Sequence, residues 1–340
     1  MSSKAEVLWV GSQGGIESSL VHRANIDFTE IPAAGVHGVS ITKLPRNLLL
    51  LISGFFASRR IMDQFKPQVI LLTGGFISVP LALAAGKTPI LVFSPDIEPG
   101  LALKVISWIA DCIAVTSEES KKYFSKKGRV FISGYPTRPE LTKWDRPSAR
   151  QKFNLSYTEP VLLIYGGSKG ARSINHAVLS QLSDLLRIAQ VIHISGDLDW
   201  SDVEAKRKEL PSELALNYHP FPYLHEDMGA AFAATDLVIS RSGASVLGEF
   251  PLFGIPAILI PYPHAWRYQL VNARYLVNCG AAVILEDSKL ENELVPSVKN
   301  VLNDPLKLET MRSSMRNLSR PQAAALIGQQ LFSLAGERSI

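Results

Sequence analysis

The sequence predicts an α/β protein with parallel sheets, and three observations indicate this class. Residues 236–272 read as strand, small-residue turn, helix and strand, which is one βαβ unit. Other short apolar runs along the chain likewise end in glycine-containing turns. The 340 residues, 46% of them apolar, suffice for two domains with hydrophobic cores. We expect domains over residues 1–142 and 150–320, with a polar linker over 141–154.

Composition and cysteine spacing exclude several classes. Cys112 and Cys279 are far apart, so the sequence has neither a disulfide framework nor zinc-ligand spacing, which favours a reducing compartment. The polar residues 1–6 predict no secretory signal. The apolar stretch 48–57 is about half as long as a membrane span. We therefore expect no transmembrane helix.

The net charge of +4 belongs to the first half of the chain. Residues 1–142 hold 15 Lys and Arg against 11 Asp and Glu, whereas the remaining 20 and 20 cancel. Basic and aromatic residues do not interleave, so nucleic acid is not an expected partner. A basic first half suits an anionic membrane surface.

Residues 43–65 predict a long helix with an unusual mixture of apolar and basic residues. Pro45 stands at its start, and Arg59 and Arg60 follow the apolar patch. The pattern fits a buried core helix or a helix that partly faces lipid. Farther on, Lys121, Lys122, Lys126, Lys127 and Arg129 form a basic cluster that is a second possible surface contact.

Two loops follow predicted strands in the first half. Gly74, Gly75 and Ser78 come after the strand over 68–72, where glycines let a ligand or another backbone approach. Asp96 and Glu98 come after the strand over 89–93. Carboxylates at the mouth of a cleft are candidate general bases, but Asp96 also fits a helix cap in a solvated turn.

The second half opens with a strand over 160–165 and the sequence Gly166-Gly167-Ser168-Lys169-Gly170-Ala171-Arg172. This is neither a dinucleotide fingerprint nor a P-loop. Glycines before a helix still form a phosphate cradle, with Ser168 as a hydroxyl donor; a plain tight turn is the alternative. The acidic Asp197-Leu198-Asp199 resembles a metal motif in form, but with no third ligand suggested we interpret it as surface.

The βαβ unit over 236–272 is the stretch around which the chain is organised. Its turn, Arg241-Ser242-Gly243-Ala244, places free N–H groups and a helix dipole at the carboxyl edge of the sheet. Glu249 lies about a turn and a half into the expected helix, where its carboxylate can accept two hydrogen bonds from a vicinal diol such as a ribose. An exposed helix residue is the alternative. The polar loop 261–269 returns to the same edge.

These residues resemble the donor-nucleotide signature of glycosyltransferase family 28. The RSGAS turn, Glu249, the 264–269 loop with Asn272 and the GGSKGA loop carry the resemblance. It implies a GT-B fold, with two Rossmann-like domains facing across a cleft and a UDP-sugar in the second domain. The implied donor-nucleotide residues are Gly167, Ser168, Lys169, Gly170, Leu224, Arg241, Ser242, Gly243, Ala244, Glu249, His264, Tyr268 and Gln269.

The resemblance also implies the chemistry. An inverting displacement would move a sugar, expected to be GlcNAc, to a polyprenyl-diphosphate-linked or other lipid acceptor. Two helix N-termini and Arg241 would stabilise the diphosphate in place of a metal, and no cofactor is expected. Asp96 is the catalytic candidate, and Gly74, Gly75, Ser78, Glu98 and Arg138 lie on the acceptor side. The implied location is cytoplasmic, peripheral on the inner face of the cell membrane, with a last helix over 321–337 packing back on the first domain.

One family feature is missing. The first strand matches the family's second strand, so the GGTGGH loop with its histidine base has no counterpart here. Three explanations are open: the start lies upstream, a partner supplies this unit, or the unit has been lost. The alternatives for function are therefore another transferase of this family in glycolipid synthesis, a UDP-sugar epimerase, or a degenerate nucleotide-sugar-binding protein.

Overall fold

The computed structural model describes residues 5–15, 17–35, 39–40, 42–124, 129–167, 170–264 and 267–336. The chain divides into two compact units. Unit 1 comprises the described residues of Met1–Ser94, Pro99–Ile132 and Leu326–Ile340. Unit 2 comprises Pro95–Glu98 and the described residues of Ser133–Ala325. We describe each unit by itself.

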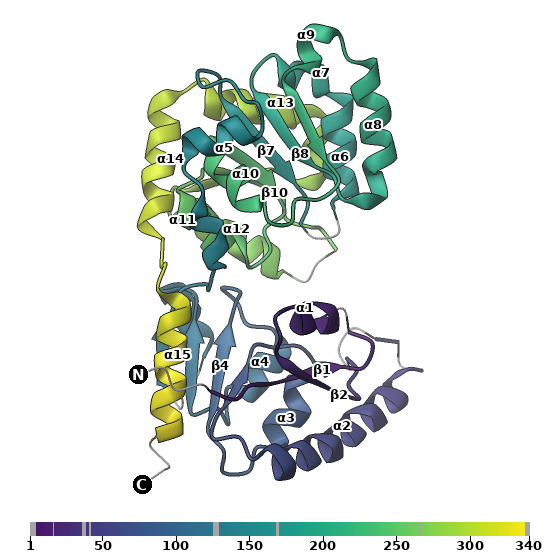
Figure 1. Ribbon diagram of the computed structural model, residues 1–340, viewed down its shortest axis with the longest axis vertical. Helices are drawn as coiled ribbons and strands as arrows, with labels where there is room; N and C mark the ends of the chain where they lie inside the picture. The colour runs from purple at the N-terminus through teal and green to yellow at the C-terminus, as the bar shows by residue number, and fades with distance from the viewer. Residues whose placement is uncertain are drawn as a thin grey trace. The chain divides into compact units, whose positions relative to one another are not determined.

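Unit 2 is built on one parallel sheet of six strands (Figure 1). Its order β12-β11-β10-β7-β8-β9 is the doubly wound order in which the first and fourth strands of the unit, β7 and β10, lie side by side. Successive strands are added to one side of β7 as far as β9, and to its other side from β10 onward, so the strand order reverses between β7 and β10. The strands are β7 (Val161–Tyr165), β8 (Gln190–Ile194), β9 (Tyr218–Phe221), β10 (Leu237–Ser240), β11 (Ala257–Leu259) and β12 (Ala282–Ile284).

Helices cover both faces of this sheet (Figure 1). Two of them start where the sequence supplies a cap: Asp145 accepts from Ser148 N at the start of α5, and Asp304 accepts from Lys307 N at the start of α14. The helices are α5 (Arg146–Lys152), α6 (Arg172–Ser180), α7 (Leu182–Leu186), α8 (Trp200–Glu209), α9 (Ser212–Ala215), α10 (Met228–Ala234), α11 (Val246–Phe253), α12 (Tyr268–Asn278), α13 (Leu290–Leu302) and α14 (Pro305–Asn317). Three short 3₁₀ helices join them: η2 (Pro139–Lys143), η3 (Asp197–Asp199) and η4 (Asp287–Lys289). The last helix, α15 (Ala323–Gly336), begins in unit 2 and continues into unit 1.

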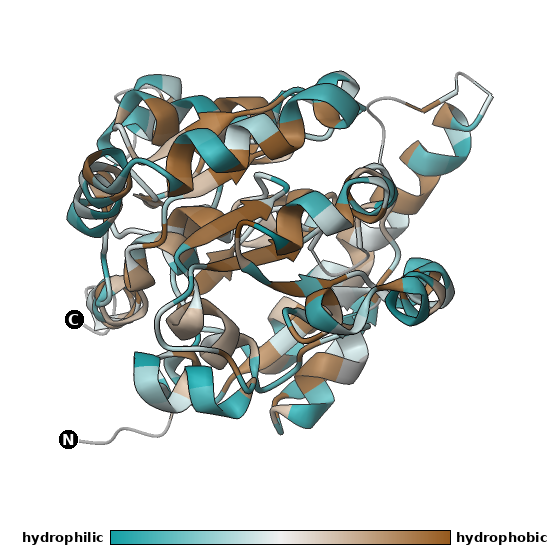
Figure 2. Ribbon diagram, turned by 90° about the horizontal axis from the view of Figure 1, so that it is seen from above, coloured by the Kyte–Doolittle hydropathy of each residue, from teal (hydrophilic) through white to brown (hydrophobic). Residues whose placement is uncertain are grey.

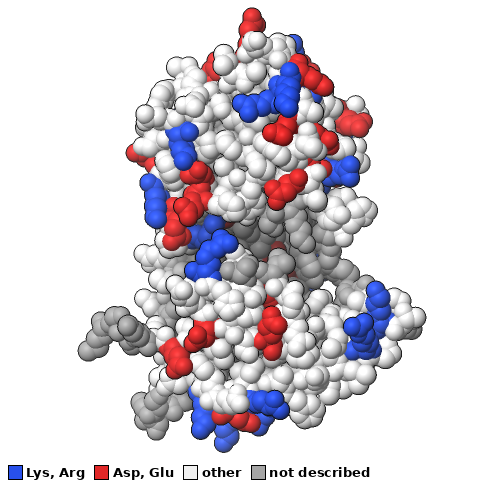
Figure 3. Space-filling model, turned by 45° about the vertical axis from the view of Figure 1, so that its right-hand side comes forward, with Lys and Arg blue, Asp and Glu red and all other residues white. Residues whose placement is uncertain are grey.

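The core of unit 2 lies between its strands and the covering helices. Every residue of β8 and β10 is buried, as expected of parallel strands that helices cover on both faces. Figure 2 shows the strands in brown between helices that carry both colours, as expected of amphipathic helices on a hydrophobic sheet. On the face of unit 2 drawn in Figure 3, basic and acidic side chains are interspersed.

A buried carboxylate fastens the amino edge of this sheet. Asp236 accepts hydrogen bonds from Val161 N and from the guanidinium groups of Arg146, Arg150 and Arg312. Arg150 is buried with it. These contacts tie α5 and α14 to the starts of β7 and β10, at the edge opposite to the one where ligands bind in such folds.

Unit 1 contains two parallel sheets. β1 (Leu8–Ser12) pairs with β2 (Asp27–Ile31), and a second sheet has the order β3 (Ile70–Leu72), β4 (Ile90–Ser94), β5 (Cys112–Val115), β6 (Arg129–Ile132). Within the described residues β1 pairs only with β2, and β3 pairs only with β4. Both sheets contribute to one hydrophobic cluster. The helical elements are α1 (Glu17–Arg23), α2 (Leu44–Phe65), α3 (Ser78–Ala84), α4 (Leu101–Ile106) and the 3₁₀ helix η1 (Glu118–Tyr123).

The predicted helix over 43–65 is present as α2, but it is not a buried core helix. Leu48, Leu49, Ile52 and Phe56 are exposed, while Gly54 and Ser58 are buried. The interpretation as a core helix is therefore wrong, and α2 presents an apolar face outward. Across the parts of the chain that the structure describes, none of the helices combines the length and apolarity that a membrane span requires.

Candidate functional site

The candidate site lies at the switch point of the unit 2 sheet. β7 and β10 pair in parallel, with Tyr165 opposite Ser240, so their following loops leave the same edge side by side. Ligands of doubly wound sheets bind at the carboxyl edge where the strand order reverses. The two loops at this place are 166–171 and 241–245, which are the glycine loop and the RSGAS turn predicted from the sequence.

The glycine loop has a backbone that glycine alone accommodates. Gly167 and Gly170 have φ values of 92° and 75°, and Gly170 N donates to Gly167 O at 3.0 Å. A Cβ on Gly166 would lie 2.2 Å from Ala171 N. Of the predicted residues here, Ser168 and Lys169 lie outside the described residues.

The RSGAS turn is fixed from one side and open on the other. Ser242 is buried, and its Oγ donates to Gln269 O at 2.8 Å. Apart from Gly243 itself and its two chain neighbours, no described residue has a heavy atom within 4 Å of the position that a Cβ on Gly243 would take. Ala244 is half-buried. The turn therefore presents Gly243 to open space, where a ligand can approach its backbone.

Glu249 stands closer to the start of its helix than the sequence indicated. α11 begins at Val246, because residues 244–245 form a turn, so Glu249 lies in the first helical turn and not a turn and a half in. Its side chain is half-buried, which contradicts the alternative of an exposed surface residue. Burial raises the pKa of Glu249, while a hydrogen bond from Ser245 and the charge of Arg138 oppose that rise.

Tyr135 is a neighbour of Glu249 that sequence reasoning did not assign to the site. A Cβ on Gly248, in the first turn of α11, would lie 2.8 Å from Tyr135 Cδ1, so the ring packs directly on that helix. Burial and the nearby charges of Glu249 and Asp96 raise the pKa of Tyr135. Three titratable groups are thus gathered beside the RSGAS turn.

Asn272 connects three segments beside this turn. Its buried amide nitrogen donates to Asp96 Oδ1 at 2.8 Å and to Ser242 O at 3.1 Å, and its oxygen accepts from Ile97 N at 3.0 Å. The segment 95–98 is therefore held on the turn through α12. The sequence indicated Asn272 as a site residue but not these partners.

The two predicted carboxylates of segment 95–98 differ in burial: Asp96 is half-buried and Glu98 is buried. Burial raises the pKa of Asp96, and the hydrogen bond from Asn272 opposes that rise. Asp96 does not cap the next helix, since α4 has Gly100 at its N-cap with no side-chain cap, so that alternative is wrong. Glu98 is 1% exposed and forms an ion pair with Arg267.

Arg241 points into the protein. Its guanidinium contacts Asp287, donates to Ser173 Oγ at 2.7 Å and to Ile260 O at 3.2 Å, and lies 5.2 Å from the centroid of the Tyr262 ring. These partners connect the RSGAS turn to α6 and η4. The arrangement favours a positioning role for Arg241 over direct contact with a diphosphate.

The loop after β11 carries His264, the first turn of α12 carries Tyr268 and Gln269, and Leu224 lies elsewhere. Tyr262 N donates to Gln269 Oε1 at 2.9 Å, and the rings of Tyr262 and His264 are in edge contact at 5.5 Å. Among the described residues, the Gln269 amide nitrogen has no hydrogen-bond partner, so it is free to donate. Tyr268 begins α12. Leu224 lies half-buried in the loop after β9.

Of the predicted acceptor-side residues, Arg138 and Glu98 belong to unit 2, whereas Gly74, Gly75 and Ser78 belong to unit 1. Gly74 and Gly75 have φ values of 113° and 79°, and Ser78 Oγ donates to Gly74 O. This hydrogen bond closes the turn between β3 and α3. The loop therefore has a defined, glycine-dependent conformation within unit 1.

The interpretation of the Asp197–Asp199 sequence as surface is wrong for Asp199. Asp199 is 5% exposed because its carboxylate accepts from Asn175 Nδ2 at 2.7 Å. Ligand atoms of His176, Asp199 and Asp202 lie within 4.8 Å of one another, a grouping able to hold a metal ion. However, Arg172 Nε lies 3.9 Å from Asp199 Oδ1 and 3.5 Å from His176 Nε2. A guanidinium cation there disfavours a metal.

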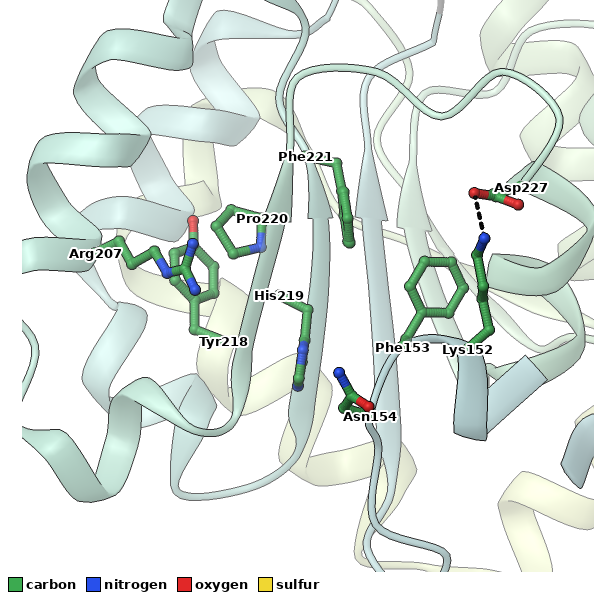
Figure 4. Close-up of a pocket in the computed structure, with 9 residues that line it drawn as sticks. All are labelled: Lys152, Phe153, Asn154, Arg207, Tyr218, His219, Pro220, Phe221 and Asp227. Carbon is green, nitrogen blue, oxygen red and sulfur yellow. Dashed lines mark ion pairs between the residues drawn. The ribbon is translucent and has the colours of Figure 1, made fainter. Parts of the chain in front are cut away.

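A separate pocket of about 280 Å³ lies beside β9, the edge strand of the sheet (Figure 4). Lys152 and Asp227, which line it, form an ion pair at 3.2 Å. Burial lowers the pKa of His219, whose Nε2 has no hydrogen-bond partner in the part of the chain described. None of the predicted donor residues lines this pocket, so it is not part of the switch-point site.

The fold and these loops define unit 2 as a doubly wound nucleotide-type binding unit, and comparison with known proteins identifies its family. The family models described as "Glycosyltransferase family 28 N-terminal domain" and "Glycosyltransferase family 28 C-terminal domain" match residues 1–115 and 161–327. A protein of Roseiflexus sp. (strain RS-1) is 36% identical over 97% of this chain and 84% of its own length. This chain therefore belongs to glycosyltransferase family 28, and the resemblance seen in the sequence is confirmed.

The names of the Roseiflexus relative and of one similar solved structure both include UDP-N-acetylglucosamine, although they name different reactions. The Roseiflexus protein is named UDP-N-acetylglucosamine–N-acetylmuramyl-(pentapeptide) pyrophosphoryl-undecaprenol N-acetylglucosamine transferase. MurG of Acinetobacter baumannii has the same fold, with a TM-score of 0.76 at 24% identity over 96% of this chain and 91% of that one. UDP-GlcNAc 2-epimerase of Neisseria meningitidis also has this fold, with a TM-score of 0.65 at 14% identity. The match covers 92% of this chain and 88% of the epimerase chain. The expected GT-B class, with two Rossmann-like domains, is confirmed.

Proposed function

We propose that this chain is an inverting glycosyltransferase that moves GlcNAc from UDP-GlcNAc to a polyprenyl-diphosphate-linked acceptor in peptidoglycan synthesis. The observation that carries the proposal is the pair of loops at the switch point, with Glu249 in the first turn of α11. The name of the 36% identical relative supports the choice of donor and acceptor.

The donor nucleotide has a place in unit 2 by this proposal. The glycine loop and the open side of the RSGAS turn supply N–H groups for the diphosphate, at the starts of α6 and α11. Glu249 accepts from the two ribose hydroxyls, and Leu224 contacts the uracil. The free amide nitrogen of Gln269 donates to the sugar, with Tyr268 and His264 beside it.

The charge of the leaving diphosphate is stabilised by backbone dipoles more than by Arg241, whose guanidinium is committed to Asp287 and Ser173. Arg241 instead holds the RSGAS turn against α6. This assignment changes the role expected from the sequence while leaving the residue in the site.

Asp96 is the proposed general base. As the bond from the anomeric carbon to the UDP oxygen breaks, the acceptor hydroxyl oxygen bonds to that carbon and Asp96 takes its proton. Burial raises the pKa of Asp96, which strengthens a carboxylate as a base. Asn272 holds the carboxylate through a hydrogen bond to Oδ1.

Unit 1 supplies the membrane contact in this proposal. Leu48, Leu49, Ile52 and Phe56 are exposed on α2, beside the exposed Arg59 and Arg60. A second exposed apolar group lies on and after α4, formed by Leu101, Val105, Trp108 and Ile109. Apolar side chains flanked by basic ones are typical of reversible attachment to anionic lipid. The inner face of the cell membrane is the corresponding location.

Two experiments test the function. Titration calorimetry of the full chain with UDP, ADP and GDP should give the tightest binding for UDP. Equal affinity for all three would remove the uracil contact at Leu224 from the proposal. Transfer of radiolabelled GlcNAc from UDP-GlcNAc to a lipid-linked muramyl peptide then separates an enzyme from a binding protein. Binding without transfer would favour the binding-only alternative, and release of the 2-epimer without acceptor would favour the epimerase.

A further inference from the structure

A chain of buried polar side chains lies beneath the glycine loop of unit 2. Asn175, on α6, is fully buried and donates through Nδ2 to Asp199 Oδ2 at 2.7 Å and to Ser195 O at 2.8 Å. Its oxygen lies 3.0 Å from His193 Nε2, and His193 Nδ1 lies 2.8 Å from Tyr218 OH. The residues come from α6, β8, η3 and β9. None of them was assigned to the site from sequence; a histidine inside an otherwise apolar strand is the signal that could have found them.

The partners of Asn175 determine which atom donates at each link. Ser195 O and the Asp199 carboxylate only accept, so the Asn175 amide nitrogen must face them and its oxygen must face His193. His193 Nε2 therefore carries a hydrogen and donates. Burial lowers the pKa of His193 to about 4, so the ring is neutral at pH 7 and its Nδ1 accepts from the Tyr218 hydroxyl. Every link of the chain is satisfied in one arrangement only.

This arrangement fixes the Ser195 carbonyl, on which the glycine loop rests. A Cβ on Gly170 would lie 2.4 Å from Ser195 O, so the loop backbone packs directly against that oxygen. Residues 195–196, which follow β8, are also held by two backbone hydrogen bonds. Ser195 N donates to Phe221 O at 3.1 Å, and Gly196 N donates to Pro222 O at 3.0 Å. Those bonds lead toward Leu224 and do not involve Asn175.

We propose that Asn175, oriented by Asp199 and His193, is a positioning residue that sets the glycine loop for the donor diphosphate through the Ser195 carbonyl. The inference rests on the proposed function, because it takes the glycine loop to be the diphosphate site. In this inference, the linked side chains make no contact with the donor; they are Asn175, Asp199, His193 and Tyr218. It also gives the buried Asp199 a role that needs no metal.

The test compares Asp199→Asn with Asp197→Asn in the full chain. Both substitutions remove one negative charge from the same 3₁₀ turn, but Asp197 is exposed and has no contact with Asn175 in the described structure. Charge alone would strengthen the binding of an anion in both variants. Loss of the charged acceptor should instead weaken UDP binding by Asp199→Asn about tenfold, whereas Asp197→Asn binds at least as tightly as wild type. The apparent KM for the donor should rise while kcat stays within about twofold of the wild type.

Uridine distinguishes loop position from general loosening of the fold. It lacks the diphosphate, so its affinity, measured by NMR titration, should be the same in wild type and both variants. Asn175→Ala, checked for folding by its Tm, should reproduce the selective loss for UDP. Unchanged UDP affinity in Asp199→Asn, or equal losses for UDP and uridine, would overturn the inference. If the wild type itself does not bind UDP, the proposed function fails instead.

Discussion

Asn272 Nδ2 donates to Asp96 Oδ1 across 2.8 Å, although 176 residues separate the two in sequence. The same amide holds Ser242 O and Ile97 N, so one side chain fixes the RSGAS turn, α12 and segment 95–98 together. The orientation of Asp96, the proposed base, therefore depends on Asn272, which follows the predicted donor residues of the 264–269 loop. Substitution of Asn272 should therefore affect both the stability of unit 2 and the orientation of Asp96.

Replacing Asn272 by Leu should destabilise unit 2. The change leaves Ser242 O and Ile97 N without this partner, and each buried group left unsatisfied costs about 1–3 kcal/mol. Urea unfolding should show a lower midpoint than wild type. The control is Asn278→Leu, which places the same side chain at the exposed end of the same helix. Equal midpoints for the two variants would mean that the Asn272 contacts carry little stability.

Replacing Glu249 by Ala should weaken UDP binding about tenfold to a hundredfold, since hydrogen bonds to a charged partner contribute about 1.5–3 kcal/mol. The Tm should hardly change, because alanine is well tolerated in helices. Calorimetry with 2′-deoxy-UDP sharpens the comparison: this ligand should bind wild type poorly and lose little more on mutation. Equal losses for both ligands would place Glu249 away from the ribose.

The affinity for uridine should fall at low pH, and the fall should begin above the range of an ordinary glutamate. Only ionised Glu249 accepts from both hydroxyls, and burial raises its pKa, so protonation sets in at a higher pH than usual. Uridine has no phosphate whose own titration would interfere. In Glu249→Gln this pH dependence should disappear. NMR titrations between pH 4 and pH 8 would check it, and a matching fall in the Gln variant would assign the effect to another group.

Vesicles containing anionic lipid should bind the full chain in a manner that weakens with salt. Substituting Leu49 and Phe56, the most exposed apolar residues of α2, by Glu should abolish this binding, because it places negative charge on the apolar face. The matched control is Leu306→Glu, at an exposed position on α14 of unit 2. Sedimentation that ignores both salt and anionic lipid would indicate aggregation instead.

The sequence predicts local features of this protein well. The strand, turn, helix and strand over 236–272 follow from apolar runs and small residues that lie next to one another, and they became β10, the RSGAS turn, α11 and β11. Glu249 was placed on the correct helix for the same reason. Its depth in the helix was overestimated because residues 244–245 form a turn that no apolar pattern reveals.

Long-range contacts could not be predicted in this way. The burial of Asp199 depends on Asn175, and the inward orientation of Arg241 depends on Asp287, 46 residues away. The pattern left the exposure of α2 undecided, because an apolar run reads the same whether protein or lipid covers it. Such features depend on the contacts that a residue makes in the folded protein with residues distant in sequence.

The open edges of β1 and β3 imply unequal amide protection within unit 1. Alternate N–H groups of a parallel strand point to each side, so among the described residues about half of those in β1 and β3 face no neighbouring strand. β4 and β5 are paired on both sides and fully buried. In deuterated water, the outward-pointing amides of β1 and β3 should therefore exchange long before those of β4 and β5. A further strand joining either edge from any source would slow that exchange, so deuterium uptake at Leu71 and Val10, whose N–H groups point away from β4 and β2, would report its arrival.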